Sequence, residues 1–109
     1  QASASQKEML ASYRKTMQTA FREVNDALVS LRELAGEETA NIAQLESARR
    51  SLKLSQARYE AGYVGFLEVL DAQRTTNLAE LTYLNSRKNR LSAAVDLFKA
   101  LGGGWREDA

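Results

Sequence analysis

The sequence predicts an all-α protein, a long antiparallel α-helical hairpin with coiled-coil-like packing, and three observations support it. The 109 residues include no proline, the residue that most strongly interrupts a helix. Five of the six glycines fall in two short clusters, at residues 62–65 and 102–104. Before the first cluster and again between the two clusters, apolar residues recur at spacings of three and four, the period of a helix that packs on another helix. We therefore expect one hairpin, residues 1–109, with a single tip.

The first predicted helix spans about residues 5–61. Ser5 and Glu8 have the spacing of a capping box, which satisfies free N–H groups in the first helical turn. The predicted seam then follows a heptad pattern through Met17, Phe21, Val24, Leu28, Leu31, Ala35, Glu38, Ile42, Leu45, Arg49, Leu52, Gln56 and Tyr59. A second stripe consists of Tyr13, Ala20, Ala27 and Leu34. It makes the apolar face wider than the seam of a two-stranded coiled coil requires. We expect the helix to continue past Gly36, with a bend there, and an end at Ala35 is the alternative.

The second predicted helix spans about residues 66–101. Its predicted seam follows Leu67, Leu70, Asn77 or Leu78, Leu81, Leu84, Leu91, Val95 and Phe98. Gly102 is expected to end it in a left-handed conformation, followed by a glycine-rich tail at residues 102–109. Gly62 should end the first helix in the same way, and Gly65 should open the second. The tip is therefore predicted at residues 62–65.

The two predicted helices differ in length. If Tyr59 lies opposite Leu67, then Leu101 lies opposite about Ala27, and everything before that point overhangs. The overhang carries an apolar stripe of Leu10, Tyr13, Met17, Phe21 and Val24. Two helices cannot enclose a full core, and such a stripe needs cover. We expect the chain to pack against other copies or further parts of its own protein, and to self-associate when alone.

Composition argues against several classes of function. The chain has no cysteine and no histidine, so the usual zinc and copper ligands and the commonest general base are missing. We predict no metal, no cofactor and no enzymatic activity. The 15 basic and 14 acidic residues are interspersed, which argues against a nucleic-acid partner. No apolar run is long enough for a transmembrane helix, and no signal-peptide core follows Gln1, which suggests a soluble piece processed or excised from a longer protein.

Three segments, in order, resemble the TolC/OprM outer-membrane efflux protein family. The segment Arg58–Arg74 is similar to the family's signature, Ala100–Trp105 to the ending of its OprM-like branch, and Ala20–Leu28 to a helix that descends from the barrel. The resemblance implies the second helical hairpin of a trimeric channel in the outer membrane of a Gram-negative bacterium. The hairpin would form part of a periplasmic α-barrel tunnel, and the β-barrel strands are absent from this chain. The implied partners are a periplasmic adaptor and, indirectly, an inner-membrane transporter.

The resemblance implies an adaptor-docking tip formed by Ala61, Gly62, Tyr63, Val64 and Gly65. The chemistry is consistent, because a residue without a Cβ lets another backbone approach closely. Alternatively, Gly62 only ends a helix. An exposed apolar Val64 suggests an interface, and we expect Phe66 to pack between the helix ends.

The resemblance also implies an aperture at the closed periplasmic end, lined by Leu67, Glu68 and Asp71 and braced by Tyr59 and Arg58. A ring of carboxylates would favour cations and draw water into a gate. The alternative for Glu68 and Asp71 is an acidic first turn that compensates the helix dipole. For Tyr59 and Arg58 the alternatives are a seam residue and a surface charge. Val64 stands where some relatives carry a gate arginine, so an ion-pair lock of that kind is not expected here.

Two hypotheses for function follow. In the first, the chain is a tunnel segment of the channel of a tripartite multidrug-resistance efflux pump, and its tip docks the adaptor. In the second, it is a generic antiparallel coiled-coil oligomerisation module, for which the tip glycine has no role in binding. An enzyme lacks support because no nucleophile–base pair or metal motif is present.

Overall fold

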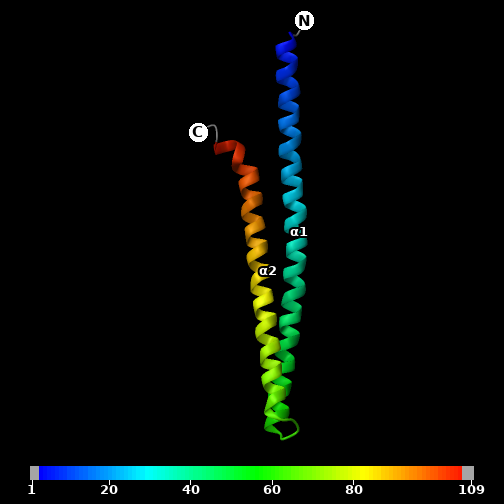
Figure 1. Cartoon of the computed structure of the whole chain (residues 1–109), viewed down its shortest axis with the longest axis vertical. Coiled ribbons are helices and arrows are strands. Elements are labelled where there is room, and N and C mark those ends of the chain that lie inside the picture. The colour runs from blue at the N-terminus through cyan, green and yellow to red at the C-terminus, as the bar shows by residue number, and fades with distance from the viewer. Residues whose placement is uncertain (1–2, 107–109) are drawn as a thin grey trace. The chain divides into compact units, whose positions relative to one another are not determined.

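The computed structural model describes residues 3–106, with side chains as far as Gly102. It contains two helices, α1 (Ala4–Glu60) and α2 (Phe66–Arg106), joined by the loop of residues 61–65 (Figure 1). The predicted all-α helical hairpin is confirmed. Neither described helix has a stretch long and apolar enough to cross a membrane.

The N-terminus of α1 is capped two residues earlier than the sequence suggested. The Ser3 hydroxyl accepts a hydrogen bond from the Gln6 backbone N–H at 3.2 Å. In return, the Gln6 side-chain oxygen, Oε1, accepts one from the Ser3 backbone N–H at 3.1 Å. These reciprocal bonds form a capping box from Ser3 and Gln6. The prediction for Ser5 and Glu8 was wrong, because serine three residues before a glutamine or glutamate occurs twice here and the earlier pair starts the helix.

Both helices continue through a glycine at which the sequence allowed the helix to end. Helix α1 is continuous across Gly36, so the alternative end at Ala35 is excluded. Helix α2 continues to Arg106 rather than ending at Leu101, and among the described residues only Gly62 has a positive φ. The left-handed stop predicted at Gly102 was therefore wrong. Glycine disfavours a helix by only about 1 kcal/mol, and no proline follows to end it. Residues 107–109 of the predicted tail, and the Trp105 side chain, lie outside the described residues.

The chain consists of two compact units. One is the hairpin of residues 33–91, in which α1 and α2 lie side by side and antiparallel (Figure 1). The other combines residues 1–32 with residues 92–109. Each is considered by itself below.

In the unit of residues 33–91, the seam between the helices is formed mostly by small or polar side chains. Its residues follow a heptad pattern on each helix and are buried or half-buried. On α1 they are Glu38, Asn41, Leu45, Ala48, Leu52 and Ser55, and on α2 they are Val69, Ala72, Thr76, Ala79, Tyr83, Ser86 and Arg90. Small side chains let two helices approach closely, and the Thr76 hydroxyl on α2 lies 3.2 Å from the Ala48 backbone carbonyl on α1.

This seam corrects the predicted one. On α1 half of the prediction holds, including Glu38, Leu45 and Leu52, but Ile42 is exposed and Ala48 and Ser55 replace Arg49 and Gln56. On α2 the predicted leucine seam was wrong, because all of its apolar members are exposed: Leu67, Leu70, Leu78, Leu81, Leu84, Leu91, Val95 and Phe98. The helix carries two heptad stripes, and the stripe of smaller side chains faces α1. Periodicity alone could not assign each stripe to its partner.

Two polar contacts join the helices across the seam. The Thr76 hydroxyl donates to the Ala72 carbonyl at 2.8 Å and also lies 3.2 Å from the Ala48 carbonyl on α1. Farther from the tip, Arg90 donates to the Glu38 carboxylate, and the two side chains are 32% and 12% exposed. Both charges occupy seam positions, so a shifted register would leave each of them against apolar neighbours.

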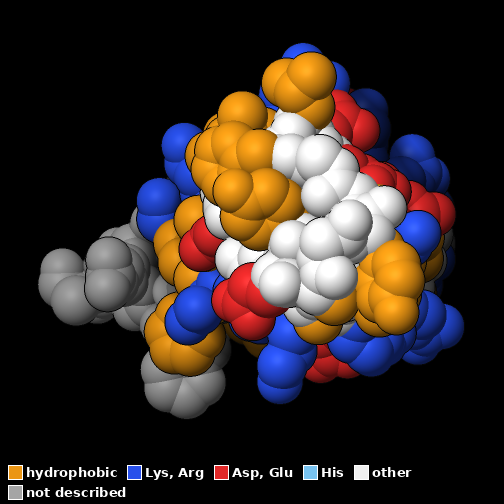
Figure 2. Space-filling view, turned by 90° about the horizontal axis from the view of Figure 1, so that it is seen from below, with side chains coloured by type: hydrophobic (Ala, Val, Ile, Leu, Met, Phe, Trp, Pro, Cys, Tyr) orange, Lys and Arg blue, Asp and Glu red, His pale blue; other side chains and the backbone are white. Residues whose placement is uncertain are grey.

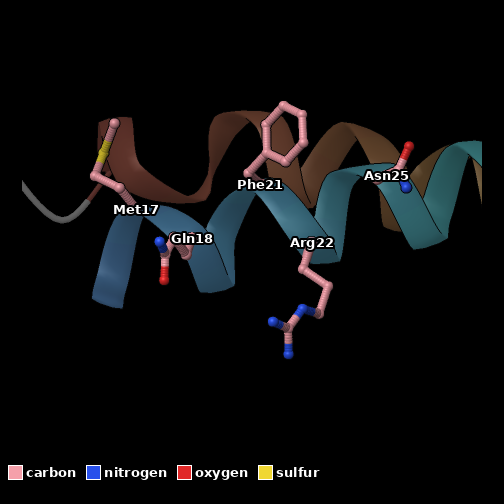
Figure 3. Close-up of a pocket in the computed structure, with 5 residues that line it drawn as sticks. All are labelled: Met17, Gln18, Phe21, Arg22 and Asn25. Atoms are coloured by element: carbon pink, nitrogen blue, oxygen red, sulfur yellow. The ribbon is translucent and has the colours of Figure 1, made fainter. Parts of the chain in front are cut away.

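In the unit of residues 1–32 and 92–109, burial is sparse. Val24, Ala27 and Leu31 of α1 and Ala93, Ala94 and Leu97 of α2 are half-buried. The side chains before Val24 are exposed, including Met9, Leu10, Tyr13, Met17 and Phe21. Met17 and Phe21 project from one side of α1 and border a shallow hollow with Gln18, Arg22 and Asn25 (Figure 3). The apolar overhang expected from the sequence is thus exposed within this chain.

The tip begins where a Schellman motif ends α1. The Tyr63 N–H donates to the Arg58 carbonyl at 2.9 Å, and the Gly62 N–H donates to the Tyr59 carbonyl at 3.0 Å. Gly62 has a φ of 82°, the left-handed conformation that side chains with a Cβ disfavour. Gly65 precedes α2 and its carbonyl accepts from the Glu68 N–H at 3.2 Å. The predicted roles of both glycines as helix stop and helix start agree with these bonds.

Replacing Glu38 with leucine should lower the free energy of unfolding by roughly 2–3 kcal/mol, because the Arg90 charge would lose its partner inside the seam. Adding Arg90→Leu should recover most of that loss, because two leucines suit the same positions. Asp71→Ala is the control, because the exposed Asp71–Arg74 pair should contribute less than about 1 kcal/mol. Urea unfolding followed by circular dichroism measures all four variants, including Arg90→Leu. A double variant no more stable than the single variants would contradict this role.

Replacing Gly62 with alanine should destabilise the hairpin by about 1 kcal/mol, because alanine disfavours a positive φ. Gly65→Ser is the matched control, because that residue has no positive φ and serine is a good N-cap. Thermal unfolding should show a lower midpoint for Gly62→Ala by several degrees. Equal midpoints for the two variants would show that the left-handed turn does not limit stability.

Candidate functional site: the hairpin tip

The tip exposes an apolar surface. Tyr63 is 79% exposed and Leu67 is 81% exposed, with Phe66 half exposed between them and Val64 half-buried. Figure 2, which looks onto this end of the chain, shows apolar side chains beside the exposed loop backbone, with acidic and basic groups around them. A Cβ built at Gly62 or Gly65 meets nothing within 4 Å, so the loop backbone is open to an approaching partner. Four of the five residues proposed for docking, 61–65, are exposed, whereas Val64, which was expected to be exposed, is half-buried.

Tyr59 and Phe66 join the two helix ends below this surface. Their ring centroids lie 5.3 Å apart at an interplanar angle of 58°, a favourable tilted arrangement. The contact bridges the last turn of α1 and the first turn of α2. Phe66 therefore packs as expected, while the 44% exposure of Tyr59 leaves part of its ring available.

The residues proposed for the aperture lie on the first two turns of α2 and the last turn of α1. Leu67, Glu68 and Asp71 are all exposed. Asp71 accepts a hydrogen bond from Arg74 at 2.8 Å, and these side chains are 68% and 75% exposed. Solvent weakens such a pair, so Arg74 can exchange it for another partner at little cost. Arg74 was not predicted as a site residue, although its i+3 spacing from Asp71 allows such a pair.

The charges at the tip match the ends of the helices. Arg58 lies in the last turn of α1, where the dipole favours a cation, and Glu68 lies in the first turn of α2, where it favours an anion. This structural role and an aperture role are compatible, because both side chains remain exposed. Among the described residues, no cluster of three or more histidine, cysteine, aspartate or glutamate side chains could hold a metal ion.

Known proteins share this hairpin in sequence. A family model described as "Outer membrane efflux protein" matches residues 1–103. Outer membrane protein OprJ of Pseudomonas aeruginosa is 49% identical over 98 residues, which cover 90% of this chain and 20% of OprJ. The pyoverdine export outer membrane protein OpmQ of the same species is 42% identical, with coverage of 96% and 22%. The toluene efflux pump outer membrane protein TtgF of Pseudomonas putida is 43% identical, with coverage of 88% and 20%.

The structural comparison agrees. A crystal structure of a membrane protein from Pseudomonas aeruginosa matches with a TM-score of 0.70 and 45% sequence identity, over 91% of this chain and 23% of that one. The chain spans about one fifth of the length of the relatives it matches. A family model that covers nearly the whole chain and relatives at this level of identity establish that the chain belongs to the outer membrane efflux protein family.

Proposed function

We propose that this hairpin is a periplasmic wall segment of the outer-membrane channel of a tripartite efflux pump. The channel is a homotrimer in which the hairpin tip docks a periplasmic adaptor, and an inner-membrane transporter acts through that adaptor. The family membership and the names of the relatives support the outer-membrane and efflux assignment. The observation that carries the docking role is the tip itself, an exposed apolar loop built around left-handed Gly62.

The tip geometry favours docking over a purely structural turn. A Schellman turn needs glycine at Gly62, but it does not need the large exposed side chains of Tyr63 and Leu67 beside it. Exposed aromatic and apolar groups next to accessible backbone are typical of protein interfaces. A generic coiled-coil module would have no use for such a surface at its tip.

The aperture proposal rests on exposure and position. Leu67 and Asp71 lie about one helical turn apart at the tip end of α2, and both are exposed. Three symmetry-related copies of these residues would place an apolar ring beside a ring of carboxylates. The first would narrow the passage and the second would favour cations. Arg74 holds Asp71 in the isolated hairpin and would compete with any partner across the aperture.

Docking is tested with Gly62→Asn in the full-length channel, because asparagine tolerates a positive φ while adding a side chain to the open backbone. Binding of the pump's own periplasmic adaptor, measured by surface plasmon resonance, should weaken by about tenfold or more. Gly65→Ser is the control on the same loop, and it should bind nearly as well as the unmodified channel. Unchanged binding by Gly62→Asn would refute the docking role.

The aperture is tested with Asp71→Asn, which removes the carboxylate ring and keeps the side-chain size. In planar bilayers, the full-length variant should lose part of its preference for cations over anions. Glu80→Gln, an exposed carboxylate farther along α2, is the matched control. If Asp71→Asn and Glu80→Gln have the same ion preference as the unmodified channel, Asp71 does not line the aperture.

A further inference from the structure

Arg74 is the only basic residue in the part of α2 nearest the tip. Over residues 66–79, the charged side chains of this helix are Glu68, Asp71 and Arg74. Asp71 is the only carboxylate within one helical turn of Arg74, and Arg74 is the only basic residue within one turn of Asp71. Among the described residues, Glu68 forms no ion pair. Along this helix, the arginine therefore serves Asp71 alone.

The contact brings the positive charge to the level of the Asp71 carboxylate. Arg74 lies about one turn farther from the tip, but its terminal nitrogen Nη2 reaches back to 2.8 Å from Asp71 Oδ1. At this separation, the two opposite charges largely cancel for any ion that passes at a greater distance. Asp71 thus keeps its carboxylate while most of its electrostatic effect is offset.

The fold does not require this pair. Both side chains are exposed, and an exposed ion pair contributes little to stability. Glutamine has nearly the same helix propensity as arginine, and position 74 lies outside the seam between the helices. Exchange of Arg74 for glutamine therefore changes the charge near the tip with little effect on the helix.

We propose that Arg74 is the counter-ion of the aperture and sets how strongly Asp71 selects cations, an inference that rests on the proposed aperture role of Asp71. Three copies of Asp71 alone would attract cations and repel anions. With Arg74 beside each carboxylate, most of that preference is cancelled, and Glu68 supplies the remaining negative charge. The aperture then passes anionic as well as cationic solutes, and Arg74 determines the balance.

Distance provides a matched control. An exposed charge acts over about 8 Å at physiological ionic strength and over about 3 Å at 1 M salt. Arg87, the next arginine along α2, is also exposed and lies more than about 20 Å from Asp71 along the helix axis. Its removal changes the total charge of the channel as much as removal of Arg74, but outside the range of the Asp71 carboxylate.

Ion selectivity of the full-length channel in planar bilayers tests the counter-ion role. The zero-current potential in a salt gradient gives the cation-to-anion permeability ratio. Arg74→Gln should raise this ratio at least about twofold, and the gain should shrink at about 1 M salt. Arg74→Lys keeps the charge and should stay near the unmodified channel, and so should Arg87→Gln.

A double variant separates the charge from a change in the shape of the passage. Asp71→Asn alone leaves Arg74 unopposed, so the ratio should fall below that of the unmodified channel. Asp71→Asn combined with Arg74→Gln removes both charges, so the ratio should return close to that of the unmodified channel. Circular dichroism checks for equal helicity, and Arg74→Met, with the same expected ratio, replaces Arg74→Gln if that variant loses helicity.

Failure of this inference is distinguishable from failure of the aperture role. An unchanged ratio in Arg74→Gln, with a lowered ratio in Asp71→Asn, would overturn the counter-ion role alone. Unchanged ratios in both variants would refute the aperture role and this inference with it. Equal gains in Arg74→Gln and Arg87→Gln would also overturn the proposal, because the effect would then come from the total charge of the channel.

Discussion

Close packing of small side chains between α1 and α2 is the constraint on which the rest of this hairpin depends. With Ala48, Ala72 and Ala79 at the seam, the pair has little room for large side chains, and no described side chain is fully buried. The large leucines consequently have no place inside the pair and occupy the outer face of α2. The seam is specified by polar contacts as well as by volume, because Arg90 and Glu38 meet within it and Thr76 reaches the Ala48 carbonyl. A hairpin built in this way leaves these leucines uncovered within the described residues.

The tip is also held by few contacts. A Schellman turn around Gly62 reverses the chain in five residues, and the Tyr59–Phe66 contact holds the two helix ends together. No further element covers the loop in the described chain, so Tyr63 and the loop backbone remain accessible. The features that make the turn compact therefore also leave it open for a partner.

The local features were predictable from the sequence, because they depend on chemistry within a few residues. Gly62 and Gly65 bracket the tip as expected, and the missing proline and the heptad periodicity correctly predicted two long helices. The assignment of helix faces was not predictable in the same way. Both stripes of α2 have heptad spacing, and the larger side chains were assigned to the wrong partner. Distinguishing them requires the distance between the helices, which is a property of the folded pair.

Two helix ends were mispredicted because each had more than one local solution. Ser3 and Ser5 both precede a suitable capping partner by three residues, and only the structure selects Ser3. Gly102 was compatible with a left-handed stop and with a helix, and the helix prevailed because the chain after it contains no proline. At the tip, Leu67 and Asp71 are exposed as an aperture role requires, while the pairing of Asp71 with Arg74 was established by the folded structure.

If this hairpin forms part of the proposed channel wall, the exposed leucines on the outer face of α2 are covered there, whereas the tip stays open until an adaptor binds. Maleimide labelling of single cysteines at Leu84 and Tyr63, in the full-length channel in cells that lack the adaptor, measures this directly. We expect slow labelling at Leu84 and fast labelling at Tyr63. Fast labelling at Leu84 would show that its face is open to solvent and would exclude a packed wall at this face.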